Sequence, residues 1–448
     1  MKTPASHAQN LLNLPRPDAA TALAEYSQDP LAFTTRCARE YGEIVPIQMA
    51  GELFCLLSNP AHITEVLKDW RLFTKAQDLK LLSGLLGTGL LTSEGSFWQR
   101  QRRLTQPIFK QRRIDSYGEV MVDYTQRMLA HWQPGAVLDV HEEMMRLTLN
   151  IVMKTIFDQD IGDGDAHKVA EALEETMTWF VEKSAALLAG DERTTSADAR
   201  YQDAIAQLDA TIYAMIDYRR QTEHPGNDLL GMFMQVVDAD DGSRMTDKQL
   251  RDEAATLMLA GHETTANTLA WTWLLLGQHP TVWAQLDQEL KTVLQGRPPT
   301  FEDLQQLPYT NMVIKEAMRL YPPVTDVTRE ASADCEIGDY HIPKGTTLIC
   351  SQWVMHHDPR YFDQPAVFNP SRWANDFEKS LPRGVYFPFS DGPRVCIGKG
   401  FAMMEAVLLL ATIAQSFRLE LDPTHVVEPQ PSVTLRPKTG IRVVLKSA

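Results

Sequence analysis

Apolar residues recur at helical spacing over most of the chain, and the longest such stretch runs from Thr246 to Gln278. Thr246 and Asp247 supply polar side chains typical of a helix start, and the pair His279-Pro280 ends the pattern. The pattern therefore predicts a helix of roughly thirty residues, far longer than the usual globular helix. A helix of this length is expected to cross the whole domain.

The remaining pattern predicts a mainly α-helical protein with a small β-rich lobe. Weak strand signals lie within 43–57, where Ala50-Gly51 separates two apolar runs, within 335–350 and within 432–446. We expect strands from both ends of the chain to meet in one sheet. Further helices are expected over 30–41, 60–70, 94–106, 114–132, 141–158, 165–189, 197–222, 281–294, 307–321 and 397–415.

The 448 residues show no internal repeat, low-complexity tract or Pro/Gly/Ser-rich linker, so one large unit over 1–448 is expected. Hydrophobic residues make up 44% and charged residues 23%, as in folded globular proteins. No apolar run reaches the length that spans a bilayer, and residues 1–18 do not resemble a signal peptide. We therefore expect a cytoplasmic protein without a membrane anchor.

Charge and cysteine content exclude several classes of function. Lys and Arg total 43 against 58 Asp and Glu, a net charge of −15, which argues against a nucleic-acid binder. The five cysteines are widely spaced and contain no Cys-x-x-Cys pair, so neither a disulfide framework nor a common zinc site is predicted. Small molecules and proteins are the expected partners.

One cysteine lies in a distinctive context, in residues 389–398, Phe-Ser-Asp-Gly-Pro-Arg-Val-Cys-Ile-Gly. Cys396 follows a loop containing Gly and Pro and directly precedes a predicted helix. Backbone N–H groups and the positive end of the helix dipole favour a thiolate there. A thiolate can serve as a soft axial metal ligand, whereas an isolated cysteine is more simply a small buried hydrophobe.

This segment resembles the haem-binding signature of the cytochrome P450 family, Phe-x-x-Gly-x-Arg-x-Cys-x-Gly, and matches every fixed position. The resemblance implies the family's fold, a triangular helical prism whose long central helix lies over haem b. It implies that Cys396 is the thiolate ligand of the haem iron and favours cleavage of the O–O bond of dioxygen, the co-substrate. Phe389 and Gly398 are then expected against the haem, and Arg394 at a propionate.

The long helix contains Ala-Gly-His-Glu-Thr-Thr at 260–265. Glycine inside a helix costs about 1 kcal/mol relative to alanine, so Ala260 and Gly261 indicate that a flat or bulky group approaches this face. The Thr264 hydroxyl can bond a carbonyl of the preceding turn. The resemblance implies that Glu263 and Thr264 deliver protons during catalysis; taken alone, the hexapeptide favours a solvated acid and an ordinary β-branched helix residue.

Further residues match the family's structural and haem-contacting positions. Glu316 and Arg319 stand three apart on one helix face. With Arg372 they resemble the family's Glu–Arg–Arg group, which is costly to break once buried and is expected to hold the loop that presents Cys396. Trp98, Arg102 and Arg329 are expected to face the haem propionates, although each is also compatible with a surface position.

The substrate is less clearly indicated. Residues 79–91 form a leucine-rich segment with Gly84, Gly87 and Gly89 that is expected to be flexible and, by resemblance, to cover the pocket. An apolar, lipid-like or terpenoid substrate follows, although core packing explains the leucines equally well. Asp326 either faces inward and binds a polar end of the substrate or faces water. The expected pocket residues are Leu82, Leu85, Leu259, Val324, Thr325 and Asp326.

The expected activity is that of a monooxygenase which hydroxylates or epoxidises an apolar molecule with electrons from a separate donor, most simply a ferredoxin and its reductase. The alternatives are a peroxygenase or isomerase of the same fold that uses hydroperoxides, and a haem sensor without turnover. Residues 100–113 contain six basic residues and no acidic residue. This stretch suggests a docking face for an acidic protein, or else a solvated basic helix. These residues are Arg100, Arg102, Arg103, Lys110, Arg112 and Arg113.

Overall fold

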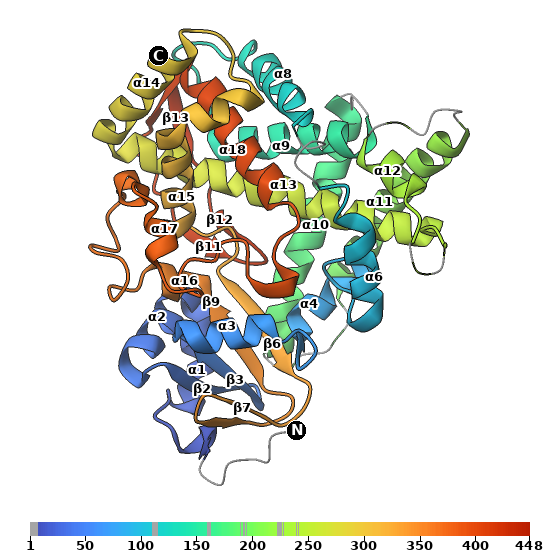
Figure 1. Ribbon diagram of the computed structural model, residues 1–448, viewed down its shortest axis with the longest axis vertical. Coiled ribbons are helices and arrows are strands. Elements are labelled where there is room, and N and C mark those ends of the chain that lie inside the picture. Colours follow the sequence, from blue (N-terminus) through green and yellow to red (C-terminus); the bar gives the residue numbers. More distant parts are fainter. Residues whose placement is uncertain are drawn as a thin grey trace.

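The longest helix, α13 (Asp247–Gln278), crosses the middle of the molecule (Figure 1), as the sequence predicts. It begins with a capping box in which Thr246 and Gln249 bond each other's backbone N–H groups. From Leu250 to Leu276 it is buried on almost every side, packed among α9, α11, α15 and α18. A helix that is buried on almost every side lies in the core, and α13 is the central support of the fold.

This computed structural model describes residues 8–109, 115–158, 163–188, 195–221, 228–238 and 242–448, with the single positions 190, 193, 226 and 240. Its α-helices are α1 (Ala19–Gln28), α2 (Pro30–Tyr41), α3 (Pro60–Lys68), α4 (Gln77–Leu81), α5 (Ser83–Leu86), α6 (Gly95–Thr105), α8 (Tyr117–Leu129), α9 (Val140–Phe157), α10 (Asp163–Leu188), α11 (Ser196–Gln221), α12 (Leu229–Gln235), α13, α14 (Pro280–Leu294), α15 (Pro308–Leu320), α16 (Gln352–His356), α17 (Phe377–Ser380) and α18 (Lys399–Ala414). Short 3-10 helices are η1 (Leu11–Asn13), η2 (Phe301–Gln306), η3 (Pro370–Trp373) and η4 (Gly392–Arg394).

The strands form four small sheets, in the orders β2-β3-β9-β6-β4, β1-β8-β7, β10-β13-β5 and β11-β12. They are β1 (Gln9–Asn10), β2 (Ile44–Met49), β3 (Glu52–Leu57), β4 (Phe73–Lys75), β5 (Val137–Asp139), β6 (Asp326–Ala331), β7 (Cys335–Ile337), β8 (Tyr340–Ile342), β9 (Thr347–Ser351), β10 (Phe417–Leu421), β11 (Pro429–Pro431), β12 (Leu435–Pro437) and β13 (Arg442–Ser447). The expected class, mainly α with a small β lobe, is confirmed.

Strands distant in sequence meet in the β lobe, as expected, but not all of them. The hairpin β2–β3 turns at Ala50-Gly51 and joins β9 in parallel, with Leu57 opposite Cys350. The expectation that the strands near the C-terminus join the same sheet is wrong. Strand β13 pairs instead with β10 and β5, because β10 follows α18 directly and offers a nearby antiparallel partner.

Several short elements were not predicted, among them α12, α16, β4 and β6. Helix α1 was not predicted, although Asp18 caps it by accepting a hydrogen bond from the Ala20 N–H. The leucine-rich segment is not an extended flexible loop but the two short helices α4 and α5. In the part of the chain that the structure describes, no helix combines the length and apolarity needed to cross a membrane. The cytoplasmic location stays a prediction.

Candidate functional site

Helix α13 has one accessible window in its otherwise buried middle. Between Leu250 and Leu276, only Leu257, Ala260, Gly261 and Thr264 escape full burial. The spacing i, i+3, i+4 and i+7 places these four residues on one helix face. The Thr264 hydroxyl donates to the Ala260 carbonyl at 2.8 Å, as predicted. We call these four residues the accessible window of α13.

Gly261 packs closely against a neighbouring helix. A Cβ atom at this position would lie 3.1 Å from Cγ2 of Val152 on α9, closer than most such contacts. The close packing of α9 on α13 therefore favours a glycine here, and the approach of a flat group to Ala260 and Gly261 stays a prediction. Ala260 is the residue whose small side chain keeps the window open.

The loop before α18 holds Cys396 by its backbone. The Cys396 N–H donates to the Phe389 carbonyl at 2.9 Å, closing the loop that contains η4. Gly392 has φ +70°, and a Cβ there would meet the Leu67 carbonyl oxygen at 2.2 Å, so a glycine is required where this loop packs on α3. Gly398 lies against the Cys396 sulfur, which its added Cβ would meet at 3.9 Å.

The pKa of the Cys396 thiol is raised, contrary to the expectation from the helix start. Although the side chain is accessible, the protein atoms around it keep most water away, and this desolvation raises the pKa. The N–H group of Gly398 and the charges of Arg102 and Lys399 act in the opposite direction but less strongly. A metal ion reverses this balance, because a coordinating thiol is deprotonated outright.

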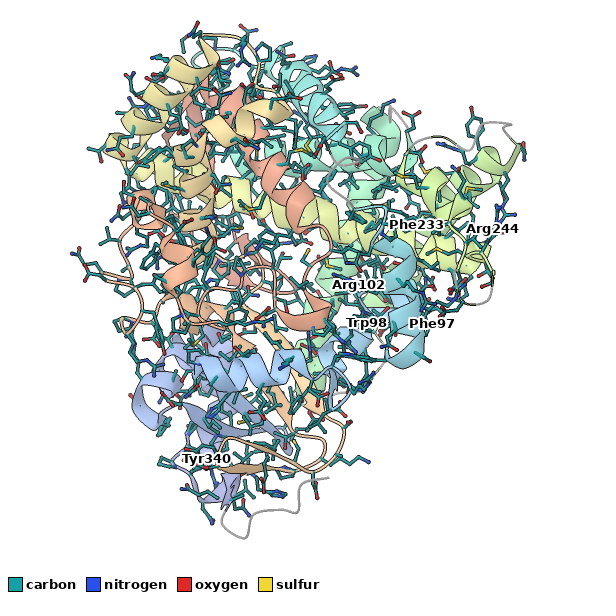
Figure 2. The ribbon with its side chains drawn as sticks, viewed as in Figure 1. Phe97, Trp98, Arg102, Phe233, Arg244 and Tyr340 are labelled. Carbon is teal, nitrogen blue, oxygen red and sulfur yellow. The ribbon has the colours of Figure 1, made fainter. Side chains whose placement is uncertain are left out.

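Positively charged side chains gather beside the cysteine loop. Arg102 on α6 donates to the Val395 carbonyl at 2.9 Å, next to Cys396, and Trp98 lies on the same helix (Figure 2). Arg329 and Lys75 are each 5% exposed. Burial, followed by the charge of Arg394, lowers the pKa of Lys75 to about 7. Lys75 was not predicted from the sequence, because no motif marks it.

Arg394 already has a protein partner, which the sequence did not predict. Its two terminal nitrogens bond the two carboxylate oxygens of Glu94, one of them at 2.8 Å. The guanidinium lies 4.8 Å from the centre of the Trp98 ring. Its buried Nε has no hydrogen-bond partner among the described residues. Arg394 therefore directs one edge of its fork at Glu94, and its Nε–H is left for an added acceptor.

Comparison with known proteins identifies the family. The family model described as "Cytochrome P450" matches residues 20–444. The chain belongs to the cytochrome P450 family. Cyclooctatin synthase from Streptomyces melanosporofaciens is 35% identical over 418 residues, covering 91% of this chain and 90% of that protein. Pentalenene oxygenase from Streptomyces avermitilis is 30% identical over 417 residues, covering 93% and 92%.

Solved structures lead to the same family. The crystal structure of cytochrome P450DA heme domain superposes with a TM-score of 0.89 at 27% identity and covers 97% of both chains. The chain is therefore a cytochrome P450 monooxygenase with the P450 fold, which binds haem b and uses O2 as co-substrate.

The residues of this P450 fit a haem. Arg102 and Arg329 supply cations at one edge of the site, and Arg394 offers its Nε. Lys75, whose pKa is lowered to about 7, is only partly charged at neutral pH and gains its proton readily beside an added carboxylate. Glu94 neutralises only part of this charge, and burial raises the pKa of the other nearby acid, Glu253, to about 7. The excess of positive charge suits a group with two carboxylates, as a haem has. Cys396 supplies the soft ligand that haem iron takes in this family.

Glu263 and Thr264 are neighbours in sequence but not in the site. Glu263 is 2% exposed, and its Oε1 accepts a hydrogen bond from Arg436 Nε at 2.5 Å and another from the Thr434 hydroxyl. Burial would raise its pKa, but Arg436 and Thr434 outweigh burial and lower it. Glu263 thus stays ionised and points to β12, while Thr264 lies in the accessible window.

The expected contacts of Glu316, Arg319 and Arg372 are confirmed. Arg319 donates to both Glu316 oxygens at 2.9 and 2.8 Å, and Arg372 donates to one at 3.0 Å. Arg319 also bonds the carbonyl of His356, whose ring accepts from the Phe387 N–H at 3.1 Å. The group is therefore connected through His356 to Phe387, in the loop that leads to Cys396.

The expected pocket residues differ in their surroundings. Leu82, Leu85 and Leu259 are buried in one apolar cluster at 2, 1 and 5% exposure, and Val324 is half-buried. Thr325 is 9% exposed and donates to Asp326 at 2.9 Å. The Asp326 carboxylate does not face water: its Oδ1 is buried without a partner among the described residues, and burial raises its pKa.

The leucine-rich segment is fastened to α13 by its glycines. A Cβ on Gly87 would meet the Asp252 carboxylate at 2.1 Å, and one on Gly89 would meet the Thr256 hydroxyl at 2.1 Å. The Thr88 N–H donates to Asp252 at 2.9 Å. This close backbone approach replaces the flexibility that the glycines suggested in the sequence.

The three described residues of the predicted basic docking face already have partners within the chain. Arg100 pairs with Asp238 at 2.8 Å, Arg103 pairs with Asp238 and Asp240 at 2.7 and 2.8 Å, and Arg102 turns to the cysteine loop. Lys110, Arg112 and Arg113 lie outside the described residues. An open cleft of about 990 Å³ borders this region, lined in part by Trp70, Trp98, Pro107, Phe109 and Pro393.

Glu405 on α18 is a buried acid that the sequence analysis used only to exclude a membrane span. It is 0% exposed, and neither carboxylate oxygen has a hydrogen-bond partner among the described residues. Burial raises its pKa to about 8. Glu405 is therefore mostly protonated at neutral pH.

This burial predicts a pH dependence of stability. Glu405 keeps its proton in the folded state at pH values where the unfolded chain has lost it, so its contribution is full at low pH and falls as pH rises toward about 8. Glu405→Gln should remove this loss and gain up to about 1.4 kcal/mol over wild type per pH unit between about pH 5 and 7. Urea unfolding across that range measures it; parallel curves for the two proteins would contradict it.

Proposed function

We propose that this P450 hydroxylates or epoxidises a terpenoid-like molecule. The observation that carries the proposal is the accessible window at Ala260 and Thr264 in an otherwise buried helix, with Leu259 beside it. The names of two relatives, cyclooctat-9-en-7-ol 5-monooxygenase and pentalenene oxygenase, support a terpenoid substrate. The buried leucines Leu82, Leu85 and Leu259 offer the apolar contacts that such a substrate requires.

The proposed reaction takes one oxygen atom from O2 into the substrate and releases the other as water, with two electrons and two protons. The haem, when bound through Cys396, supplies the redox chemistry of O2 activation. Thr264 is proposed to hold a proton donor at the window through its hydroxyl. Glu263 is proposed to supply protons from the other side of α13, which requires that its carboxylate leave Arg436.

Spectral titration of the holoenzyme tests the substrate class. Cyclic di- and sesquiterpenes and their alcohols, added one at a time, are expected to change the haem absorption at micromolar concentration, whereas fatty acids of similar size are not. Product analysis by mass spectrometry should then show a gain of one oxygen atom from labelled O2. Spectral changes and products with fatty acids alone would replace the terpenoid proposal by a lipid one.

The electron donor is proposed to be a ferredoxin served by a separate reductase. Its docking place is proposed to be the open cleft beside the cysteine loop, where Trp70, Phe109 and Pro393 offer apolar contacts. Arg100 and Arg103 contribute less charge than the sequence suggested, because Asp238 and Asp240 partly neutralise them. The donor's reduction of this P450 should therefore depend only weakly on salt.

Thr264→Ala is expected to retain substrate binding but lose about 10-fold in product per electron pair, because the hydroxyl that holds a proton donor is gone. Hydrogen peroxide should account for the missing electrons. Thr272→Ala is the matched control, since the Thr272 hydroxyl makes the same kind of bond to a helix carbonyl, at 2.7 Å, but is fully buried. Equal coupling in the two variants would refute the role of Thr264.

A further inference from the structure

Arg436 on β12 connects carboxylates of two different helices. Its Nε donates to Glu263 Oε1 on α13 at 2.5 Å, and its Nη1 donates to both oxygens of Glu174 on α10 at 3.0 and 2.9 Å. The side chains of Glu263 and Arg436 are 2% and 15% exposed, whereas that of Glu174 is 58% exposed. One guanidinium thus links a buried acid to an acid at the surface.

The other neighbours of Glu263 hold it in the same direction. The Thr434 hydroxyl donates to the same Oε1 atom, and the Asn267 amide donates to Thr434 at 3.1 Å. His141 bonds Asn267 at 3.0 Å through its Nε2. These groups come from α9, α13 and the loop before β12, and none of them belongs to the accessible window that contains Thr264. The carboxylate is therefore held away from that window.

Arg436 is the cation that keeps Glu263 ionised. Among the described groups whose charge acts on this acid are His141 and His262, but burial lowers the pKa of both imidazoles, so they are neutral at pH 7. Glu174 faces Arg436 from α10 and adds negative charge. An ionised acid paired with a cation has no proton to give, so the pair must separate before Glu263 can pass one on.

Glu174 ties this pair to the position of α10. Helix α10 packs against α11 and α9 and runs at a steep angle to α13 in the view of Figure 1. Because Glu174 uses a different edge of the guanidinium from Glu263, Arg436 can satisfy both acids only while α10 keeps its present place. A shift of α10 changes how the charge of Arg436 is shared.

We propose that Arg436 is a positioning residue which sets when Glu263 can take part in proton delivery, and that Glu174 makes this depend on where α10 lies. The inference rests on the proton-delivery role proposed for Glu263. It adds two residues, on β12 and α10, that touch neither the haem site nor the accessible window.

Infrared spectroscopy of the resting holoenzyme tests the Arg436 contact without turnover. The band of a protonated carboxyl group is followed between about pH 5 and 8 in wild type, Arg436→Gln, and the double variant Arg436→Gln/Glu263→Gln. Arg436→Gln is expected to gain a band that the double variant lacks. The pH at which half of Glu263 is protonated should rise by at least about one unit, a tenfold change in the protonation constant. Arg436→Lys keeps a cation and should restore the ionised state. No new band in Arg436→Gln would overturn the proposal.

The Glu174 link is tested by Glu174→Gln, which leaves Glu263 as the sole carboxylate partner of Arg436. Protonation of Glu263 should then move to lower pH, and product per electron pair, measured with a plant-type ferredoxin and its reductase, should fall several-fold. Glu182→Gln, an exposed glutamate of the same helix, is the matched control and should change neither quantity. Equal behaviour of the two variants would overturn the link to α10.

The same measurements separate this inference from the role of Glu263 itself. If Glu263→Gln lowers coupling but Arg436→Gln leaves the infrared spectrum unchanged, the proton-delivery role stands and the positioning role fails. If Glu263→Gln leaves coupling and the solvent isotope effect as in wild type, the proposed role of Glu263 fails, and the positioning role falls with it.

Discussion

Cys396→Ser is expected to abolish oxygenase activity and the thiolate spectrum of the reduced, carbon monoxide-saturated protein. The sulfur is the one soft ligand in the loop between Phe389 and α18, and the N–H groups that support it cannot make a hydroxyl into an equivalent electron donor. The far-ultraviolet circular dichroism should stay mainly helical, because the loop is closed by backbone bonds rather than by the side chain.

The matched control for this variant is Cys335→Ser. Cys335 is also a free, partly accessible cysteine, but it lies on β7 in the β lobe. It should keep the thiolate spectrum and full turnover. A reduced carbon monoxide spectrum of Cys396→Ser that is identical to wild type would show that Cys396 is not the ligand.

Arg319→Gln is expected to lower the free energy of unfolding by about 3–5 kcal/mol, because it leaves the Glu316 charge buried without its main partner. Glu316 and Arg319 are both 0% exposed, and Trp373 and Asn369 depend on the same carboxylate for hydrogen bonds. Denaturant unfolding of the holoenzyme measures the change. Arg319→Lys keeps the charge but lacks the fork that bonds both oxygens, so it should lose less.

The control for this second prediction is Lys291→Gln on α14. Lys291 pairs with Asp287 at 2.7 Å, but its side chain is 65% exposed, so the variant should lose less than about 1 kcal/mol. If Arg319→Gln is no more destabilised than Lys291→Gln, the buried group does not hold the fold. Failure of Arg319→Gln to fold would agree with the prediction, provided that Arg319→Lys folds with reduced stability.

The sequence predicts best those features that depend on local pattern. The length of α13, the hairpin at Ala50-Gly51 and the contact of Glu316 with Arg319 all follow from periodicity, turn residues or spacing along one helix. Family resemblance marked Cys396 and Arg102 as haem-site residues, and the structure brings Arg102 to the Val395 carbonyl next to Cys396. Each of these depends on neighbours that are close in sequence or on a complete motif.

The features that the sequence did not predict depend on distant partners. The terminal nitrogens of Arg394 bond Glu94, 300 positions away in the sequence, and Arg436 on β12 bonds Glu263 on α13. Gly261 packs closely against Val152 on the neighbouring helix α9. No local pattern records such contacts, because the residues involved are ordinary in their own segments and acquire their surroundings only when the chain has folded.

The parallel pairing of β3 with β9 has a consequence for how the protein is made. Leu57 lies opposite Cys350, so the β lobe cannot close until most of the chain has left the ribosome. Long-range strand pairing of this kind is slow, and the unpaired edge of β3 stays open to association with other chains meanwhile. Expression at low temperature with added chaperones should therefore raise the soluble yield more than any substitution on the helical side of the molecule.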